Sequence, residues 1–155
     1  MDTVIPDTDV MTEQLRSIMP IKLEPLAIGS QRIGLVIVDE VNGFVGSITG
    51  DGRNLVVDWV NKHKLEAVLV VGICTDICVM DFVLTFLSAR NHEMMPSLKD
   101  ILVYEEACST YHLPRHMAEK IGIGAHAAHP QDITHYMGLY FMASRGAKLV
   151  DRVTV

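Results

Sequence analysis

The sequence lacks a cationic block, a long apolar run and an even number of cysteines, and each absence excludes a class of protein. Its formal charge is -6 at pH 7, which argues against nucleic acid or an anionic membrane as a partner, because either needs a cationic surface. The longest apolar run, AVLVVGIC, is far too short to cross a bilayer. With three cysteines and no secretory leader at MDTVIPDTD, we expect free thiols in a reducing compartment, the cytoplasm or the nucleus.

What the sequence does contain is enough apolar material for one domain. Its 155 residues are 49% hydrophobic, so a core can form without disulfides or metals to support it. We expect a single domain over residues 31–155. Residues 1–30 precede it as a lead-in with a short helix near Val10 to Met19.

Two periodicities alternate along residues 31–155. Continuous apolar runs typical of buried parallel strands lie at 33–39 and 67–74, and weaker strand patterns lie at 101–104 and 147–153. Helical patterns lie between them, at 54–64, 76–90, 114–120 and 132–145. This alternation predicts the α/β class, a doubly wound parallel sheet flanked by helices.

The most informative stretch is VVGICTDICV, residues 70–79, where a predicted strand changes directly into a helix. Thr75 or Asp76 is the expected N-cap, so Cys78 falls in the first helical turn. Unpaired N–H groups and the helix dipole favour a thiolate there and can also hold an oxyanion. Asp39 ends the neighbouring strand, and ligands bind beyond the carboxyl ends of such strands. It is therefore the candidate to serve as, or to orient, a general base.

Other interpretations of these residues stay open at this point. A buried free cysteine is commonly a small hydrophobe, and a carboxylate that closes a strand is often a cap or a turn former. The C-x3-C spacing of Cys74 and Cys78 differs from the C-x2-C dithiol motif, and the sequence has no second cysteine pair for a zinc site. We interpret His126 and His129 as loop residues, and Glu105–Glu106 as a solvated turn.

Taken together, these stretches resemble a known family. VIVDEVNGF (36–44) and VVGICTDICV (70–79) are similar to the paired signatures of the isochorismatase-like cysteine hydrolases. Three further stretches resemble the plant branch of nicotinamidases: VLTFLSARN (83–91), AHPQ (128–131) and HYMGLY (135–140). The resemblance starts near Gly34 and continues to the C-terminus, with one gap.

The resemblance implies an isochorismatase-like fold and a Cys, Asp, Lys triad that hydrolyses nicotinamide to nicotinate and ammonia in NAD salvage. By position, it assigns the nucleophile to Cys78 and the acid/base to Asp39. Phe44 matches an aromatic residue that lines the pyridine pocket. The backbone of Cys74, after a non-proline cis peptide at Ile73–Cys74, is implied to form the oxyanion hole with the N–H group of Cys78.

The gap lies between the two signatures. Only residues 40–77, 38 positions, separate Asp39 from Cys78, far fewer than in the family. The family implies a divalent metal such as Zn, held by an Asp and two His of this interval. The interval contains a single histidine, His63, so we assign no metal ligand in this chain.

The triad lysine also has no match, because Lys62 and Lys64 belong to a predicted helix. GFVGSITGDGRNLVVDWV (43–60) resembles the segment that follows the lysine in complete members, so we predict that a segment is missing near 43–45. The sheet is then expected to have about four strands, with the strand 33–39 at an open edge that invites pairing.

Two hypotheses follow from this residue inventory. The first is a nicotinamidase acting on the small molecule nicotinamide, weak or inactive in this shortened chain. The alternative is a non-catalytic chain that is unstable or pairs with a full-length homologue. In either case an open sheet edge predicts an oligomer of like or unlike chains.

Overall fold

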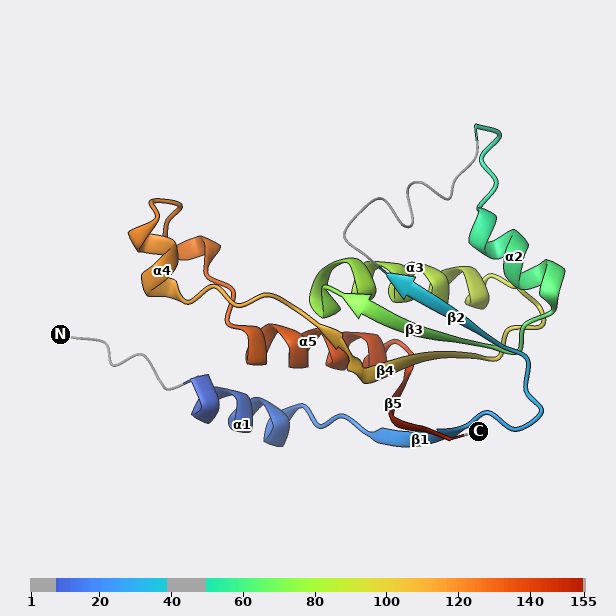
Figure 1. The fold of residues 1–155 in the computed structure, drawn as a ribbon, viewed down its shortest axis with the longest axis horizontal. Helices are drawn as coiled ribbons and strands as arrows, with labels where there is room; N and C mark the ends of the chain where they lie inside the picture. The colour runs from blue at the N-terminus through green and yellow to red at the C-terminus, as the bar shows by residue number, and fades with distance from the viewer. Residues whose placement is uncertain (1–7, 39–49, 155) are drawn as a thin grey trace.

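The computed structural model describes residues 8–38 and 50–154. The elements in chain order are α1 (Thr8–Ile18), β1 (Leu23–Ala27), β2 (Ile33–Val38), α2 (Leu55–His63), β3 (Ala67–Ile73), the π-helical turn η2 (Thr75–Val79), α3 (Met80–Asn91), β4 (Asp100–Ser109), α4 (Arg115–Lys120), the short 3-10 turn η3 (Ala125–Ala127), α5 (Gln131–Ser144) and β5 (Lys148–Thr154). Figure 1 shows α4 beyond the end of the sheet and α1 alongside α5. Among the described segments, no helix has the length and apolar character to span a bilayer.

The strands form one parallel sheet in the order β1-β5-β4-β3-β2, which confirms the α/β parallel class. The expected count of about four strands is wrong, because Leu23–Ala27 pairs with β5 and adds a fifth. The sequence of residues 23–27 indicates only an extended lead-in, since the segment is short and contains Pro25. At a sheet edge, however, proline is tolerated, and the register shifts between Glu24 and Pro25.

The other edge of the sheet is β2, as predicted. It pairs with β3 along its whole length, from Ile33 with Ala67 to Val38 with Gly72, and no described strand lies on its outer side. Leu35 is 56% exposed and Ile37 71% exposed. The described edge is therefore apolar and uncovered, which is the type of edge that recruits another strand.

Strand β4 differs from the prediction because it extends five residues beyond Tyr104, to Ser109. Glu105 and Glu106 therefore lie in a strand, and their interpretation as a solvated turn is wrong. After a register shift, Gly72 pairs with Cys108 and Ile73 with Ser109. β4 is longer than predicted because the last residues of β3 pair with its end.

The two faces of the sheet are packed differently. Successive residues of β3 point to opposite faces: Val68 and Val70 join a large core cluster with residues of α2, α3 and α5, including Phe86, whereas Ala67 and Leu69 join a small cluster. No residue of the described helices belongs to that small cluster. The described helices of the core therefore cover one face, and we call the other the bare face.

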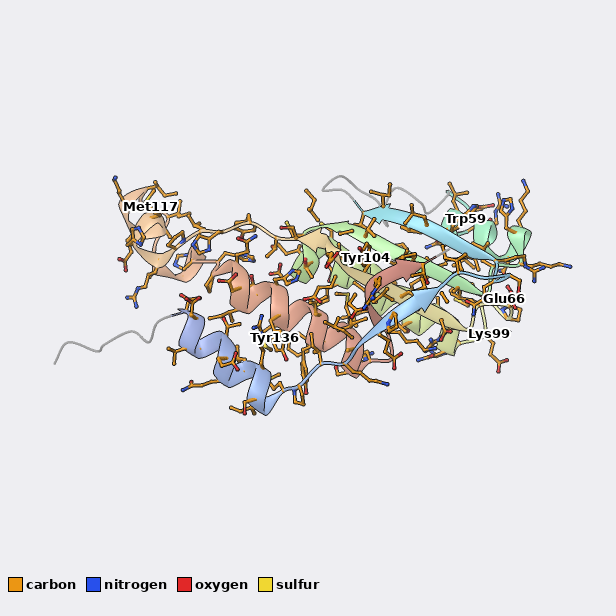
Figure 2. All side chains as sticks on the ribbon, turned by 60° about the horizontal axis from the view of Figure 1, so that its bottom comes forward. Trp59, Glu66, Lys99, Tyr104, Met117 and Tyr136 are labelled. Carbon is orange, nitrogen blue, oxygen red and sulfur yellow. The ribbon has the colours of Figure 1, made fainter. Side chains whose placement is uncertain are left out.

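Two contacts illustrate how the covered face is built. A Cβ atom on Gly34 would lie 2.3 Å from the ring of Trp59, so the absence of a side chain lets α2 approach β2. Helix α1 is held against α5 by Tyr136, whose hydroxyl donates to the carbonyl of Met19 at 2.8 Å. Figure 2 shows Trp59 and Tyr136 at these two places.

Candidate active site

The sequence VVGICTDICV forms the junction of β3, η2 and α3. The peptide bond between Ile73 and Cys74 is cis, which confirms that prediction. The carbonyl of Cys74 accepts hydrogen bonds from the N–H groups of Ile77 and Val79, both at 3.1 Å, and so closes the turn. Cys78 lies half-buried in this turn and packs against the core.

The predicted cap of this helix is wrong. Cys74 occupies the N-cap position and no side chain caps the turn. The side chains of Thr75 and Asp76, the two expected caps, instead bond to histidines far along the chain. A π-helical turn places both side chains against the start of α5, because η2 contacts that helix.

Thr75 is fully buried and bonded to α5. Its Oγ1 lies 2.8 Å from Nδ1 of His135, 60 residues away in the sequence. Burial lowers the pKa of His135, while the neighbouring Glu105 and Asp76 oppose that shift. The histidine ring beside the turn is therefore held in its neutral form over a wider pH range than a free imidazole.

Asp76 is bonded to His129. Its Oδ2 lies 2.7 Å from Nε2 of His129, and both side chains are at most 15% exposed. Nδ1 of His129 lies 2.9 Å from the carbonyl oxygen of Tyr111, and the two rings stack with centroids 3.9 Å apart. His129 is thus a partner of the turn that carries Cys78, a contact that its loop position in the sequence did not indicate.

Gly138 of α5 gives the turn room to approach. A Cβ atom there would lie 2.8 Å from Cα of Asp76, closer than such atoms come in proteins. His129, His135 and Gly138 were all missed as individual residues. The signal for them was the presence of AHPQ and HYMGLY among the stretches that carry the family resemblance.

Strand β2 ends beside the same turn. Val38 pairs with Gly72, whose φ is +136°, and a Cβ atom on Gly72 would lie 1.9 Å from the carbonyl oxygen of Val38. Asp39 follows Val38 in the sequence, and both Asp39 and Phe44 lie outside the described residues. The structure therefore brings the strand that leads to Asp39 to the loop that carries Cys78, and leaves both assignments as predictions.

The three cysteines differ in exposure. Cys74 and Cys108 are buried, whereas Cys78 is half-buried, and none of them forms a disulfide. Burial raises the pKa of Cys108 to about 11, so its thiol stays protonated near neutral pH and is a poor nucleophile. Of the three thiols, that of Cys78 is therefore the most accessible to a small-molecule substrate.

The described residues between the two signatures do not supply the metal ligands or the lysine that the family resemblance implies. Among the described residues, no three His, Cys, Asp or Glu side chains converge as a metal ligand set. Lys62 and Lys64 lie at the C-terminal end of α2, just before β3 begins. Cys78 follows the other end of that strand, about 20 Å away at the usual rise per residue. The described residues therefore do not fit a metal or a triad lysine beside Cys78.

Comparison with known proteins gives one curated relative. Over 116 residues, 75% of this chain, the sequence is 50% identical to Nicotinamidase 1 of Arabidopsis thaliana, and the match covers 47% of that protein. The chain thus spans about half the length of the curated relative it matches, which fits a shortened chain. No family model and no solved structure matches. Over its matched part the chain is therefore similar to a plant nicotinamidase, as its signatures predicted.

Proposed function

We propose that this chain is a nicotinamidase-type amide hydrolase that converts nicotinamide to nicotinate and ammonia, with weak or no turnover. One observation carries the proposal: Cys78 lies half-buried in the turn that follows β3, in a chain 50% identical to Nicotinamidase 1 over its matched part. The proposed compartment is the cytoplasm, with the nucleus second, supported by the three free thiols.

The proposed reaction has two steps. The thiolate of Cys78 attacks the carboxamide carbon, a C–S bond forms and the C–N bond breaks, and ammonia leaves with the proton that Asp39 took from the thiol. Water then attacks the thioester, releasing nicotinate and restoring the thiol. Backbone N–H groups of Cys74 and Cys78 are proposed to hold the oxyanion in both steps.

The proposed weakness follows from two groups that the described residues do not place beside Cys78, a lysine and a metal ligand set. Catalytic groups act as a unit, so the loss of one costs on the order of 10^3-fold or more in turnover. The described residues supply neither a lysine at the carboxyl end of a strand nor a metal ligand set.

Ammonia release from nicotinamide by the purified chain tests the proposal. We expect slow release that disappears in Cys78→Ala and persists in the control Cys108→Ala, because the Cys108 thiol is buried and burial raises its pKa to about 11. Release at the rate of a complete nicotinamidase would contradict the predicted weakness. Equal release by the parent chain and Cys78→Ala would contradict the nucleophile.

A second candidate function is supported by the apolar edge of β2. A non-catalytic chain that pairs through this edge with a complete homologue would cover Leu35 and Ile37, which are 56% and 71% exposed. Co-expression of the two chains, followed by capture of the complete one, tests this candidate. We expect co-capture that Ile37→Lys abolishes; an Ile37→Lys chain captured as well as the parent would exclude pairing at this edge.

A further inference from the structure

A cavity of about 610 Å³ lies at the end of the molecule where α4 extends beyond the sheet (Figure 1). Its walls come from α1, from α4 and the segment before it, and from the start of α5. None of the described residues that line it belongs to β3, η2 or α3. The cavity is therefore separate from the turn that carries Cys78, and its volume is within the range of small-molecule sites.

The walls of this cavity are fixed by hydrogen bonds between the segments on either side of α4. Leu113 and His129 exchange two backbone hydrogen bonds, at 2.9 and 2.7 Å. The backbone N–H group of Gln131 donates to Nδ1 of His112 at 3.2 Å, and its side chain donates to the carbonyl of Thr110 at 2.7 Å. The cavity is thus formed before a ligand enters, which lowers the entropy cost of binding.

Apolar and charged residues occupy different parts of the cavity. The apolar residues that line it are half-buried: Met11, Pro114, Ala128, Pro130 and Ile133. The lining residues with charged or imidazole side chains are exposed: His112, Arg115, His116 and Glu119. A ligand that fits this arrangement has an apolar body for the inner part and a polar group for the mouth.

The side chains at the mouth mainly donate hydrogen bonds. Because Nδ1 of His112 accepts from a backbone N–H group, the neutral ring carries its proton on Nε2 and offers a donor there. Nε of Arg115 donates to Glu119 at 3.1 Å, and the two terminal nitrogens of the guanidinium have no partner among the described residues. Glu119 is the one carboxylate among the described lining residues, and it is already paired. The mouth therefore favours a ligand group that accepts hydrogen bonds from an arginine, as a carboxylate does.

We propose that this cavity binds a small monocarboxylate with an apolar ring. The carboxylate is held by Arg115 and His112 at the mouth, and the ring packs against Met11 and Ile133. The arginine supplies the charge, and the apolar walls select against short carboxylates such as acetate. Nicotinate, the product of the proposed reaction, is one member of this class, so the test distinguishes this cavity from the turn that carries Cys78.

The probe is benzoate, and the measurement is NMR of the methionine methyl groups in the folded full chain. Met11 lines the cavity, whereas Met80 begins α3, two positions after Cys78, so their signals report on the two places. Met11→Leu and Met80→Leu assign these signals. We expect benzoate to shift the Met11 signal with a Kd on the order of 1 mM, as for a ligand of this size. A Met11 signal that benzoate leaves unchanged would overturn the proposal, whether or not Met80 responds.

Arg115→Met tests the charge at the mouth. We expect the Kd of benzoate, measured at the Met11 signal, to rise at least about tenfold, because a charge-assisted hydrogen bond is lost. Arg145→Met is the control and should keep the parent value, since Arg145 is exposed at the far end of α5 and does not line the cavity.

Benzamide tests the same point without a variant. It has the same ring and no charge, so we expect it to bind the parent chain at least about tenfold more weakly than benzoate. Equal Kd values for the Arg115→Met and Arg145→Met chains, or benzamide that binds as tightly as benzoate, would overturn the proposal. Ammonia release enters none of these measurements, so a failure of the proposed function leaves them readable.

Discussion

The covered and the bare face of the sheet have comparable strand sequences and very different surroundings. On the covered face, Val70 and Phe86 are fully buried between the strands and the helices. On the bare face, Leu35 and Ile37 are more than half exposed, and the small cluster there consists of strand residues. The difference shows that an apolar run in the sequence predicts a strand but does not predict whether a helix packs on each of its faces.

The same difference between covered and uncovered parts of the sheet is seen around the candidate site. The turn that carries Cys78 belongs to the covered side, where α3 and α5 contact it and His129 and His135 bond to its side chains. The predicted gap lies after β2, at the uncovered edge. The turn that carries Cys78 is therefore packed on one side, next to a side that is open in the described residues.

The largest expected effect is on the core of the covered face. Phe86→Ala should lower the free energy of unfolding by about 3–5 kcal/mol, because it leaves a cavity among packed side chains. Leu35→Ala on the bare face should change it by only about 0.5 kcal/mol. Urea unfolding followed by circular dichroism measures both. Equal losses would contradict the distinction between the two faces.

The next largest effect is expected at the contact between β2 and β3, where Gly72 pairs with Val38. Gly72→Ala should destabilise the chain by about 1–3 kcal/mol, because its φ of +136° and the carbonyl of Val38 leave no room for a side chain. Gly50→Ala is the control, since nothing lies within 4 Å of the place that a Cβ atom would take there and its φ lies outside the left-handed region. A neutral Gly72→Ala in urea unfolding would mean that β2 separates from β3 at little cost.

A smaller effect is expected from pH on the covered side. The pKa of His135 is lowered from 6.5 by burial, so the unfolded chain binds more protons than the folded one below that pH. This contribution to stability is complete above about 6.5 and is lost as the pH falls through the folded-state pKa. The carboxylates of Glu105, Asp76 and Asp132 oppose this lowering of the pKa. Other charged groups near the ring line a cavity of about 310 Å³ beside it: Asp9, Glu13 and Arg16.

Urea unfolding of the parent and of His135→Gln, at pH 7.5 and pH 5.5, measures this contribution. The parent should lose more stability than the variant between the two pH values. His92→Gln, at an exposed position, should behave as the parent does. If His135→Gln loses as much stability as the parent, the histidine is not held neutral by burial.

The smallest effect on folding is expected at the edge of the bare face. Ile37→Lys should change the free energy of unfolding within about 0.5 kcal/mol and should reduce self-association, because a charge on an edge strand opposes strand pairing. Sedimentation velocity over a range of concentrations measures the association. Ile121→Lys, at an exposed apolar position after α4, is the control, and an equal reduction there would indicate non-specific contacts.

The elements that were predicted correctly share one property: their signal is local. The apolar runs that became β2 and β3 and the turn around Cys78 are each contained in about ten residues. The elements that were predicted wrongly depend instead on pairing between segments that are distant in the sequence. β1 was missed because LEPLA becomes a strand through its pairing with β5, at the other end of the chain, and Glu105 was placed in a turn because β4 is extended by its pairing with β3.

By itself, the sequence determined the α/β class, the positions of the main strands and the strand-to-helix turn that carries Cys78, since hydrophobic periodicity and a short motif encode them locally. Only the tertiary structure decided which side chains support that turn. Thr75 and Asp76 meet His135 and His129 across 60 and 53 residues, and Gly138 admits the turn against α5. Such contacts depend on how helices and strands pack together, and that packing also determines which face of the sheet is covered.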